Sequence, residues 1–381
     1  MNRTKGGRDE GRAGGLRGAV GGADLFALRS HNTALVLDLL RAADVDGISR
    51  LELAERTGLT PQAVSKITAR LREEGLVTEA GRRASTGGKP RTVLRLVPEA
   101  GHAVGVHLDR DELRAVLVDL KGSVVGERCT PLDLGAGAEA VLGEVEGAVA
   151  AVLGTGVVPG LTGVGVALPG PLDHARGVLH RVTGFPEWDG FPLRAALEER
   201  LGVPVVVDKD TNAAALGLAV GRGGGGGSFA YLHLGTGLGA GLVIGGNVHR
   251  GARTGAGEFG HQVIQLDGPL CTCGDRGCIE ALCLEAVARG EVDEAARVLG
   301  AGAANLVGLL DIDVVLLGGR TVAAAPEVFV RGVGAVLEER ARREGAGEDV
   351  VPVRVAPGGV QGVAEGAAQL LLAPVFGRGD G

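Results

Sequence analysis

The sequence has no long apolar run and no hydrophobic leader. None of its apolar stretches approaches the roughly 18–20 residues that a membrane-spanning helix needs. Residues 1–22 are rich in glycine and arginine and contain no apolar stretch, so we do not expect a secretory signal there. We therefore expect a cytoplasmic protein without a membrane partner, in which residues 1–22 form a disordered tail.

Lysine and aromatic residues are also scarce. The 381 residues include 5 lysines against 34 arginines, one tryptophan and one tyrosine, whereas glycine occurs 69 times. This skew is typical of a GC-rich genome, so a single glycine is weak evidence for a special turn or a phosphate-binding loop. Apolar residues still make up 45% of the chain, which is enough for buried cores in roughly two or three domains.

Positive charge is deficient over the whole chain but not in its first part. The formal net charge of −7 argues against a nucleic-acid-binding protein, since such proteins usually carry a basic surplus. Residues 1–98, however, contain 17 Lys or Arg against 11 Asp or Glu, whereas residues 99–381 contain 22 against 35. We therefore expect polyanions to contact only the N-terminal part.

Two helices joined by a tight turn are predicted within residues 49–71. Ser49 and Glu52 can form a capping box at the start of the first helix, and Gly58 permits the left-handed turn that ends it. The second helix begins near Thr60 and carries side chains suited to reading base edges and gripping phosphate: Thr60, Gln62, Ser65, Lys66 and Arg70. This pattern favours a DNA-binding helix-turn-helix over the alternative, an ordinary helical hairpin with a solvated face.

A basic, glycine-rich segment follows between two short predicted strands. It contains four basic residues, two of which, Lys89 and Arg91, could reach phosphates or the minor groove. A flexible surface loop would also be glycine-rich, but its basic residues favour a DNA-contacting wing. We therefore predict a winged helix-turn-helix domain over residues 23–98.

Beyond Pro98, strands alternate with helices, which predicts an α/β body of two lobes over residues 99–381. We expect strands at residues 104–108, 113–120, 164–167, 203–207, 230–234, 241–244 and 314–317, and helices at residues 139–153 and 193–201.

Two polar segments of the body lie where ligands usually bind. The glycine-rich residues 235–239 follow a strand and could present backbone amides to phosphate, although an ordinary turn explains them equally well. Asp210 follows the strand expected at 203–207, and a carboxylate there could accept a hydroxyl proton or bind a sugar. The alternative is that Asp208, Asp210 and Asn212 only cap a helix.

Three of the five cysteines lie within eight residues. Cys271, Cys273 and Cys278 follow His261, and together these side chains complete a tetrahedral set for structural Zn²⁺. Disulfides are not expected without a secretory signal, and buried free cysteines would explain the clustering poorly. We therefore predict a structural zinc site.

With these motifs the chain resembles the ROK family of repressors, open reading frames and sugar kinases. It is most similar to the winged-helix repressor branch, which includes xylose and N-acetylglucosamine repressors. The resemblance runs from about Leu25 to Leu372 and rests on the N-terminal domain and on residues 165–173, 210–214, 235–239 and 258–280.

The resemblance implies a sugar-kinase-like body of the ribonuclease-H, actin-like type, with a sugar held between its lobes. By matching position, the sugar would be contacted by Lys209, Asp210, Glu258, His261 and Glu280. His261 would also bind the zinc, and the metal would thereby orient His261 and Glu280.

Departures from the family pattern separate a regulator from a kinase. The kinases of the family carry an Asp-x-Gly-Gly-Thr phosphate loop, and the corresponding stretch here, residues 107–111, reads His-Leu-Asp-Arg-Asp. The glycines are missing, and Asp109 and Asp111 would repel a triphosphate, although Asp210 remains at the position of the kinase base. Lys209 replaces the usual sugar-binding asparagine, and it would either pair with a carboxylate or favour an acidic or phosphorylated sugar.

We therefore predict a sugar-responsive regulator, typically a repressor of carbohydrate uptake or catabolism genes, and not an enzyme. It would bind double-stranded operator DNA as a homodimer or homotetramer. The alternative is an ATP-dependent sugar kinase with an accessory DNA-binding domain, favoured by residues 235–239 and Asp210. A third possibility is a DNA-binding protein that binds no ligand because Lys209 disables the pocket.

Overall fold

The computed structural model describes residues 31–43, 46–85, 88–182, 184–221, 227–345 and 349–378, except for the side chains of residues 82–90. The tail expected at residues 1–22 and the first residues of the N-terminal domain lie outside these ranges. Within them, no helix is both long and apolar enough to cross a membrane.

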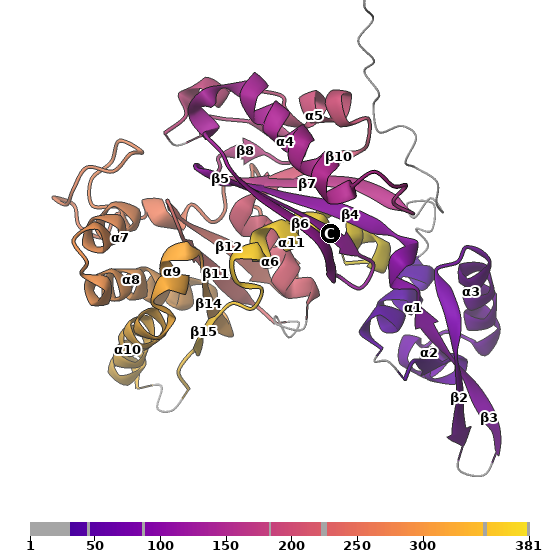
Figure 1. The fold of residues 1–381 in the computed structure, drawn as a ribbon. Helices are drawn as coiled ribbons and strands as arrows, with labels where there is room; N and C mark the ends of the chain where they lie inside the picture. Colours follow the sequence, from indigo (N-terminus) through magenta and orange to yellow (C-terminus); the bar gives the residue numbers. More distant parts are fainter. Residues whose placement is uncertain are drawn as a thin grey trace, which may run out of the picture.

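The N-terminal unit, called the head below, is a winged helix-turn-helix at one end of the molecule (Figure 1). It consists of α1 (His31–Ala42), β1 (Ile48–Ser49), α2 (Arg50–Thr57), α3 (Pro61–Glu73), β2 (Val77–Ser85) and β3 (Gly88–Leu96), with sheet order β1-β3-β2. The expected caps are confirmed. Ser49 and Glu52 form a capping box, Gly58 takes a left-handed conformation with φ 70°, and the Thr60 hydroxyl accepts from the Ala63 amide.

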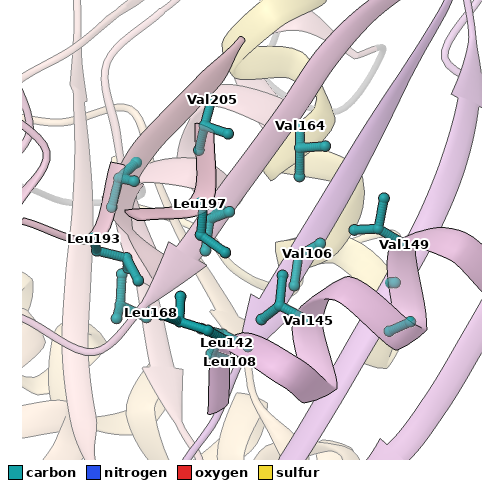
Figure 2. Close-up of a cluster of buried hydrophobic side chains, with 14 of the residues drawn as sticks. Val106, Leu108, Leu142, Val145, Val149, Val164, Leu168, Leu193, Leu197 and Val205 are labelled. Carbon is teal, nitrogen blue, oxygen red and sulfur yellow. The ribbon is translucent and has the colours of Figure 1, made fainter. Parts of the chain in front are cut away.

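The first lobe of the body (residues 102–209) is built on a five-stranded sheet with the order β10-β7-β4-β5-β6. Its strands are β4 (His102–Leu108), β5 (Glu112–Asp119), β6 (Val124–Pro131), β7 (Leu161–Leu168) and β10 (Val205–Lys209); the hairpin β8 (Leu172–Asp173) and β9 (Val178–Leu179) lies apart. Two helices, α4 (Ala138–Leu153) and α5 (Leu193–Leu201), cover one face of this sheet. Figure 2 shows their contact with the strands, in which Leu142, Val145 and Leu197 meet the buried valines of β4, β7 and β10.

The second lobe (residues 229–355) repeats the plan with the sheet order β13-β12-β11-β14-β15. Its strands are β11 (Phe229–Leu234), β12 (Leu238–Ile244), β13 (Asn247–Val248), β14 (Val314–Gly318) and β15 (Val353–Val355). Its helices are α7 (Ile279–Ala288), α8 (Val292–Leu310), α9 (Arg320–Ala324) and α10 (Pro326–Glu344). The predicted strands and helices of both lobes are therefore present, with ends that differ by a few residues.

Two helices, α6 (Asp210–Val220) and α11 (Gly362–Leu372), lie between the two sheets (Figure 1). The backbone of α11 lies directly on β4 and β7. A Cβ atom on Gly105 or Gly165 would stand only 1.9 Å from the carbonyl oxygen of Ala364 or Ala367, respectively. Glycine at these two strand positions is therefore required by close approach and is not merely part of the general glycine excess.

The head and the body share one apolar core. Val36, Leu37 and Leu40 of α1 belong to the same buried cluster as Leu371 of α11 and Phe376. An exposed ion pair, in which both Nε and Nη2 of Arg378 lie 2.9 Å from the carboxylate of Asp38, adds to this contact. The C-terminal segment thus fastens α1 to the body.

Candidate functional site

One face of α3 is free to meet a ligand. Val64 and Leu71 are fully buried and fix the orientation of the helix, so that Gln62, Ser65 and Lys66 are exposed on the opposite side. Thr68, which sequence reasoning missed, is also buried, and its hydroxyl donates to the Val64 carbonyl at 2.9 Å. These three predicted DNA-contacting side chains are therefore accessible on one side of α3.

The other predicted DNA-contacting residues differ in how they are held. The hydroxyl of Thr60 is engaged in capping α3, at 3.2 Å from the Ala63 amide. Arg70 is exposed but tethered, since its Nη2 donates to Thr33 Oγ1 of α1 at 2.8 Å. Arg91 is exposed on β3, while the side chain of Lys89 lies outside the described residues.

A second candidate site is a cavity of about 80 Å³ between the two lobes. Five predicted sugar-contacting residues come from both lobes and line it together: Lys209, Asp210, Glu258, His261 and Glu280. Asp109, Thr236 and Leu238 complete part of its wall. The structure therefore brings the whole predicted set to one place.

Asp210 is the first residue of α6 and faces this cavity. Its Oδ1 accepts from the Thr211 amide at 2.6 Å. Burial, reinforced by the negative charge of Asp109, raises the pKa of Asp210 to about 7. A carboxyl with that pKa can accept or donate a hydrogen bond at neutral pH, which suits a hydroxyl group.

Lys209 is buried and already paired. Its Nζ lies 3.1 Å from Glu258 Oε1 and donates to the Ala256 carbonyl at 2.5 Å. Of the two alternatives considered for Lys209, pairing with a carboxylate is the one observed. In this ion pair the carboxylate of Glu258 neutralises the positive charge of Lys209 inside the cavity, and Lys209 holds Glu258 in position.

Glu280 holds the β11–β12 turn in place. Its Oε2 accepts from the Leu238 amide at 2.8 Å, and the residue as a whole is only 5% exposed. Within the same turn, the Gly235 amide donates to the Gly237 carbonyl at 2.9 Å. At least two amides of the glycine-rich segment are therefore engaged inside the protein instead of being presented to phosphate.

Asp109 and Asp111, which the sequence predicts at the position of the kinase phosphate loop, join the two lobes. Asp109 Oδ1 accepts from Thr236 Oγ1 at 2.8 Å, and Asp109 Oδ2 accepts from Arg320 Nη2 at 3.0 Å. The same guanidinium binds Asp111 through Nη1 at 3.0 Å and Nη2 at 2.5 Å. Although burial opposes it, the neighbouring charges and hydrogen-bond donors lower the pKa of Asp109. We call this network, which sequence reasoning missed, the interlobe clasp.

The predicted zinc ligands converge. One donor atom from each of His261, Cys271, Cys273 and Cys278 lies within 4.8 Å of the others. Cys271 Sγ stands 3.7 Å from His261 Nδ1, and Cys273 Sγ stands 3.7 Å from Cys278 Sγ. A tetrahedral ion with Zn–S bonds of about 2.3 Å requires sulfur atoms about 3.8 Å apart, so both the donor set and the spacing fit zinc.

His261 belongs to both sites, because it is one of the four clustered residues and also lines the interlobe cavity. It ends a short 3₁₀ turn, Phe259–His261, that directly follows Glu258. The order of His261 and of the cavity wall is therefore tied to the cysteine cluster.

Comparison with known proteins gives these sites a context. Residues 103–288 match the ROK family model, and residues 36–78 match a winged helix-turn-helix DNA-binding model. A xylose repressor of Caldicellulosiruptor bescii is 27% identical over 82% of this chain and 88% of its own length. The DNA-binding transcriptional dual regulator NagC of Escherichia coli is 31% identical over 71% of this chain and 66% of its own length.

Solved structures show the same fold. A ROK family transcriptional regulator, described as a homologue of the E. coli MLC protein, superposes with a TM-score of 0.73 over 91% of this chain and 96% of that one, at 22% identity. A ROK hexokinase from Thermus thermophilus is 34% identical over 70% of this chain and 96% of its own, with a TM-score of 0.57. The chain therefore belongs to the ROK family and carries a winged helix-turn-helix before its ROK body.

Proposed function

We propose that this protein is a sugar-responsive transcriptional regulator, typically a repressor of genes for carbohydrate uptake or catabolism. The observation that carries the proposal is that one chain joins a winged helix-turn-helix, with polar side chains exposed on α3, to an interlobe cavity lined by carboxylates and an imidazole. The repressor relatives and the regulator with the same fold support it. The operator would be double-stranded and palindromic, read by the heads of a homodimer or homotetramer.

The proposed effector is a sugar or sugar derivative bound in the cavity. Asp210, Glu258 and Glu280 offer acceptors and His261 offers a further polar atom, and sugar hydroxyls can both donate and accept. Because these residues come from both lobes, a sugar that binds one lobe arrangement better would shift the population toward it. The shared core between α11 and α1 offers a route by which that shift reaches the head.

We further propose that the metal bound by the cluster is structural Zn²⁺. It would be held by His261, Cys271, Cys273 and Cys278, a closed set that leaves no position for a catalytic water. When bound, the metal would fix the imidazole of His261 at the edge of the cavity.

The structure gives two reasons to propose that phosphoryl transfer is absent. Asp109 and Asp111 would stand where the kinases of the family carry their phosphate loop, and their partner Arg320 is the first residue of α9 on the opposite lobe. A nucleotide phosphate would have to break the interlobe clasp and then face the two carboxylates. Without phosphate positioning, Asp210 alone provides little catalysis.

A coupled ADP-release assay tests this claim against the competing kinase, which the similarity to the hexokinase favours. We expect no sugar-dependent ATP turnover with common hexoses and pentoses, either in the native protein or in Arg320→Ala. Turnover above about 1 s⁻¹, which lies in the ordinary enzyme range, would contradict the proposal and establish a kinase with a DNA-binding head.

Substitution on α3 tests the DNA-binding role. Lys66 is exposed and forms no ion pair with any residue in the described ranges, so Lys66→Ala should leave folding intact. We expect operator affinity to fall several-fold and the slope of log K against log salt to decrease by about 1 per lost phosphate contact. Arg343→Ala, which removes an exposed charge from α10, is the matched control and should change neither quantity. If Lys66→Ala and Arg343→Ala bind the operator equally well, the proposal that α3 contacts DNA is wrong.

A further inference from the structure

A second cavity is larger than the interlobe cavity that Asp210 and Glu258 line. It has a volume of about 300 Å³ and lies where α1 of the head, the β5–β6 turn, α6, α11 and the second lobe meet. Its walls share no residue with the interlobe cavity described above. Much of its lining is apolar or glycine, including Leu218, Val322 and Val355, and its charged residues are Arg41, Lys121 and Glu365.

Arg41 lines this cavity and has no role in the function proposed above. It lies in the last turn of α1, and its guanidinium stands 4.7 Å from the ring centre of Phe376. Its Nη2 donates to Gln369 Oε1 at 3.3 Å, but its buried Nη1 has no hydrogen-bond partner in the part of the chain that the structure describes. Burial lowers the pKa of Arg41 to about 10, which still leaves it charged at neutral pH.

Asp38 and Asp119, whose negative charges act on Arg41, are engaged elsewhere. Asp38 binds Arg378 through both of its oxygens at 2.9 Å, and Asp119 Oδ1 accepts from the amides of Lys121 and Ser123 at 2.8 and 2.9 Å. Arg41 forms no ion pair with any carboxylate of the described residues, in contrast to Lys209 in the other cavity. Arg41 is partly buried, and a cation in such a place without a close counter-charge is costly, a cost that an anionic ligand would relieve.

The geometry around Arg41 also suits a ligand larger than a simple ion. Gly122 in the β5–β6 turn has no side chain, and a Cβ there would lie 3.3 Å from Arg41 Nη2. On the opposite wall Gly318, Gly319 and the residues around Pro357 leave room for an organic group beside apolar side chains. Arg41 and Lys121 thus provide positive charge in the cavity, while the wall around Pro357 and Gly358 is mostly apolar and contains the carboxylate of Glu365.

We propose that this cavity binds a small phosphate-bearing organic molecule, with the phosphate at Arg41 and Lys121 and the organic part between α6 and the second lobe. Two cations suit a dianion, and the guanidinium fork matches phosphate oxygens. Because Arg41 belongs to the head, the ligand favours the head orientation that keeps Arg41 in the cavity. This regulatory consequence rests on the proposed function, whereas the binding itself does not.

Titration calorimetry on the full chain tests the binding, with inorganic phosphate, glucose 6-phosphate, AMP and neutral glucose as probes. We expect glucose 6-phosphate or AMP to bind, and we expect Arg41→Gln and Lys121→Ala each to weaken that binding at least fivefold. Lys121→Ala is informative even if Arg41→Gln disturbs the shared core, because Lys121 lies in a surface turn. Arg343→Ala and Asp210→Asn should leave the affinity unchanged.

Three results would overturn the proposal. The first is that no phosphate-bearing probe binds. The second is that AMP binds with an affinity that neither Arg41→Gln nor Lys121→Ala changes, which would place the nucleotide away from these two side chains. The third is that Asp210→Asn abolishes binding, which would place the phosphate compound in the interlobe cavity.

The effect of the bound ligand on DNA binding is measured separately. We expect the bound probe to change the affinity for operator DNA by about fivefold or more, the usual scale of such coupling. An affinity that the probe leaves unchanged would overturn the coupling. Since calorimetry needs no DNA, a failure of the proposed regulatory function would not be mistaken for a failure of the phosphate site.

Discussion

Cys273→Ser should release the metal and uncouple the body from its effector while leaving the head folded. One of the four donors is lost, and the remaining three cannot close a tetrahedral structural site. We expect zinc to fall from about one ion per chain to near zero. The loss should destabilise the body by roughly 3–5 kcal/mol, since loss of a metal belongs among the large single-site effects.

Metal analysis and calorimetry on the same samples provide the measurement. Cys129→Ser is the matched control, because it removes a thiol that is exposed and lies outside the cluster. The sugar-induced rise in melting temperature should disappear in Cys273→Ser, since His261 lines the cavity and would lose its anchor. Native protein that purifies without any bound metal and does not take up zinc would contradict the zinc proposal.

Asp210→Asn should make the protein more stable at alkaline pH and insensitive to sugar. The folded-state pKa of Asp210, about 7, lies above its ordinary value of 3.8, so the folded protein binds this proton more tightly than the unfolded chain does. Stability from this group is therefore complete below about pH 4 and is lost as the pH rises through 7. Asparagine removes the cost of the buried charge.

The expected gain is on the order of 2 kcal/mol at pH 8, because solvent in the cleft screens part of the cost. It should shrink to well under about 1 kcal/mol at pH 4, where the folded carboxyl is protonated and the unfolded one, with a pKa of 3.8, is about half protonated. Melting temperatures of the two proteins from pH 4 to 8, each with and without sugar, measure both effects. Equal stability of the two proteins across that range would show that the buried carboxylate carries no cost. An unchanged sugar-induced shift in Asp210→Asn would show that Asp210 does not contact the sugar.

Local features of the fold were predictable because they depend on near neighbours in the sequence. The capping box of Ser49 and Glu52 and the left-handed turn at Gly58 require only residues of one helix and its ends. The cysteine cluster was predictable for the same reason, since three of its ligands lie within eight residues. The family resemblance then supplied the five cavity residues, which residue spacing alone would not have assembled.

Long-range contacts were not predictable in this way. Arg320 meets Asp111 across 209 residues of sequence, and nothing near Arg320 marks it as a partner of Asp111. The fastening of α1 by Phe376 and Arg378 joins opposite ends of the chain. Such contacts depend on how the lobes and head pack, and a periodic pattern of apolar residues carries no information about them.

The most direct test of a sugar-responsive regulator is fluorescence anisotropy on a labelled fragment of the DNA upstream of the gene. The full chain is titrated at fixed salt, alone and with each of a panel of sugars and sugar phosphates. We expect specific binding in the absence of ligand and a change in affinity of about 5- to 150-fold with at least one sugar that carries no phosphate, lost in Asp210→Asn. Tight DNA binding that no compound alters, or no preference over unrelated DNA, would contradict the account.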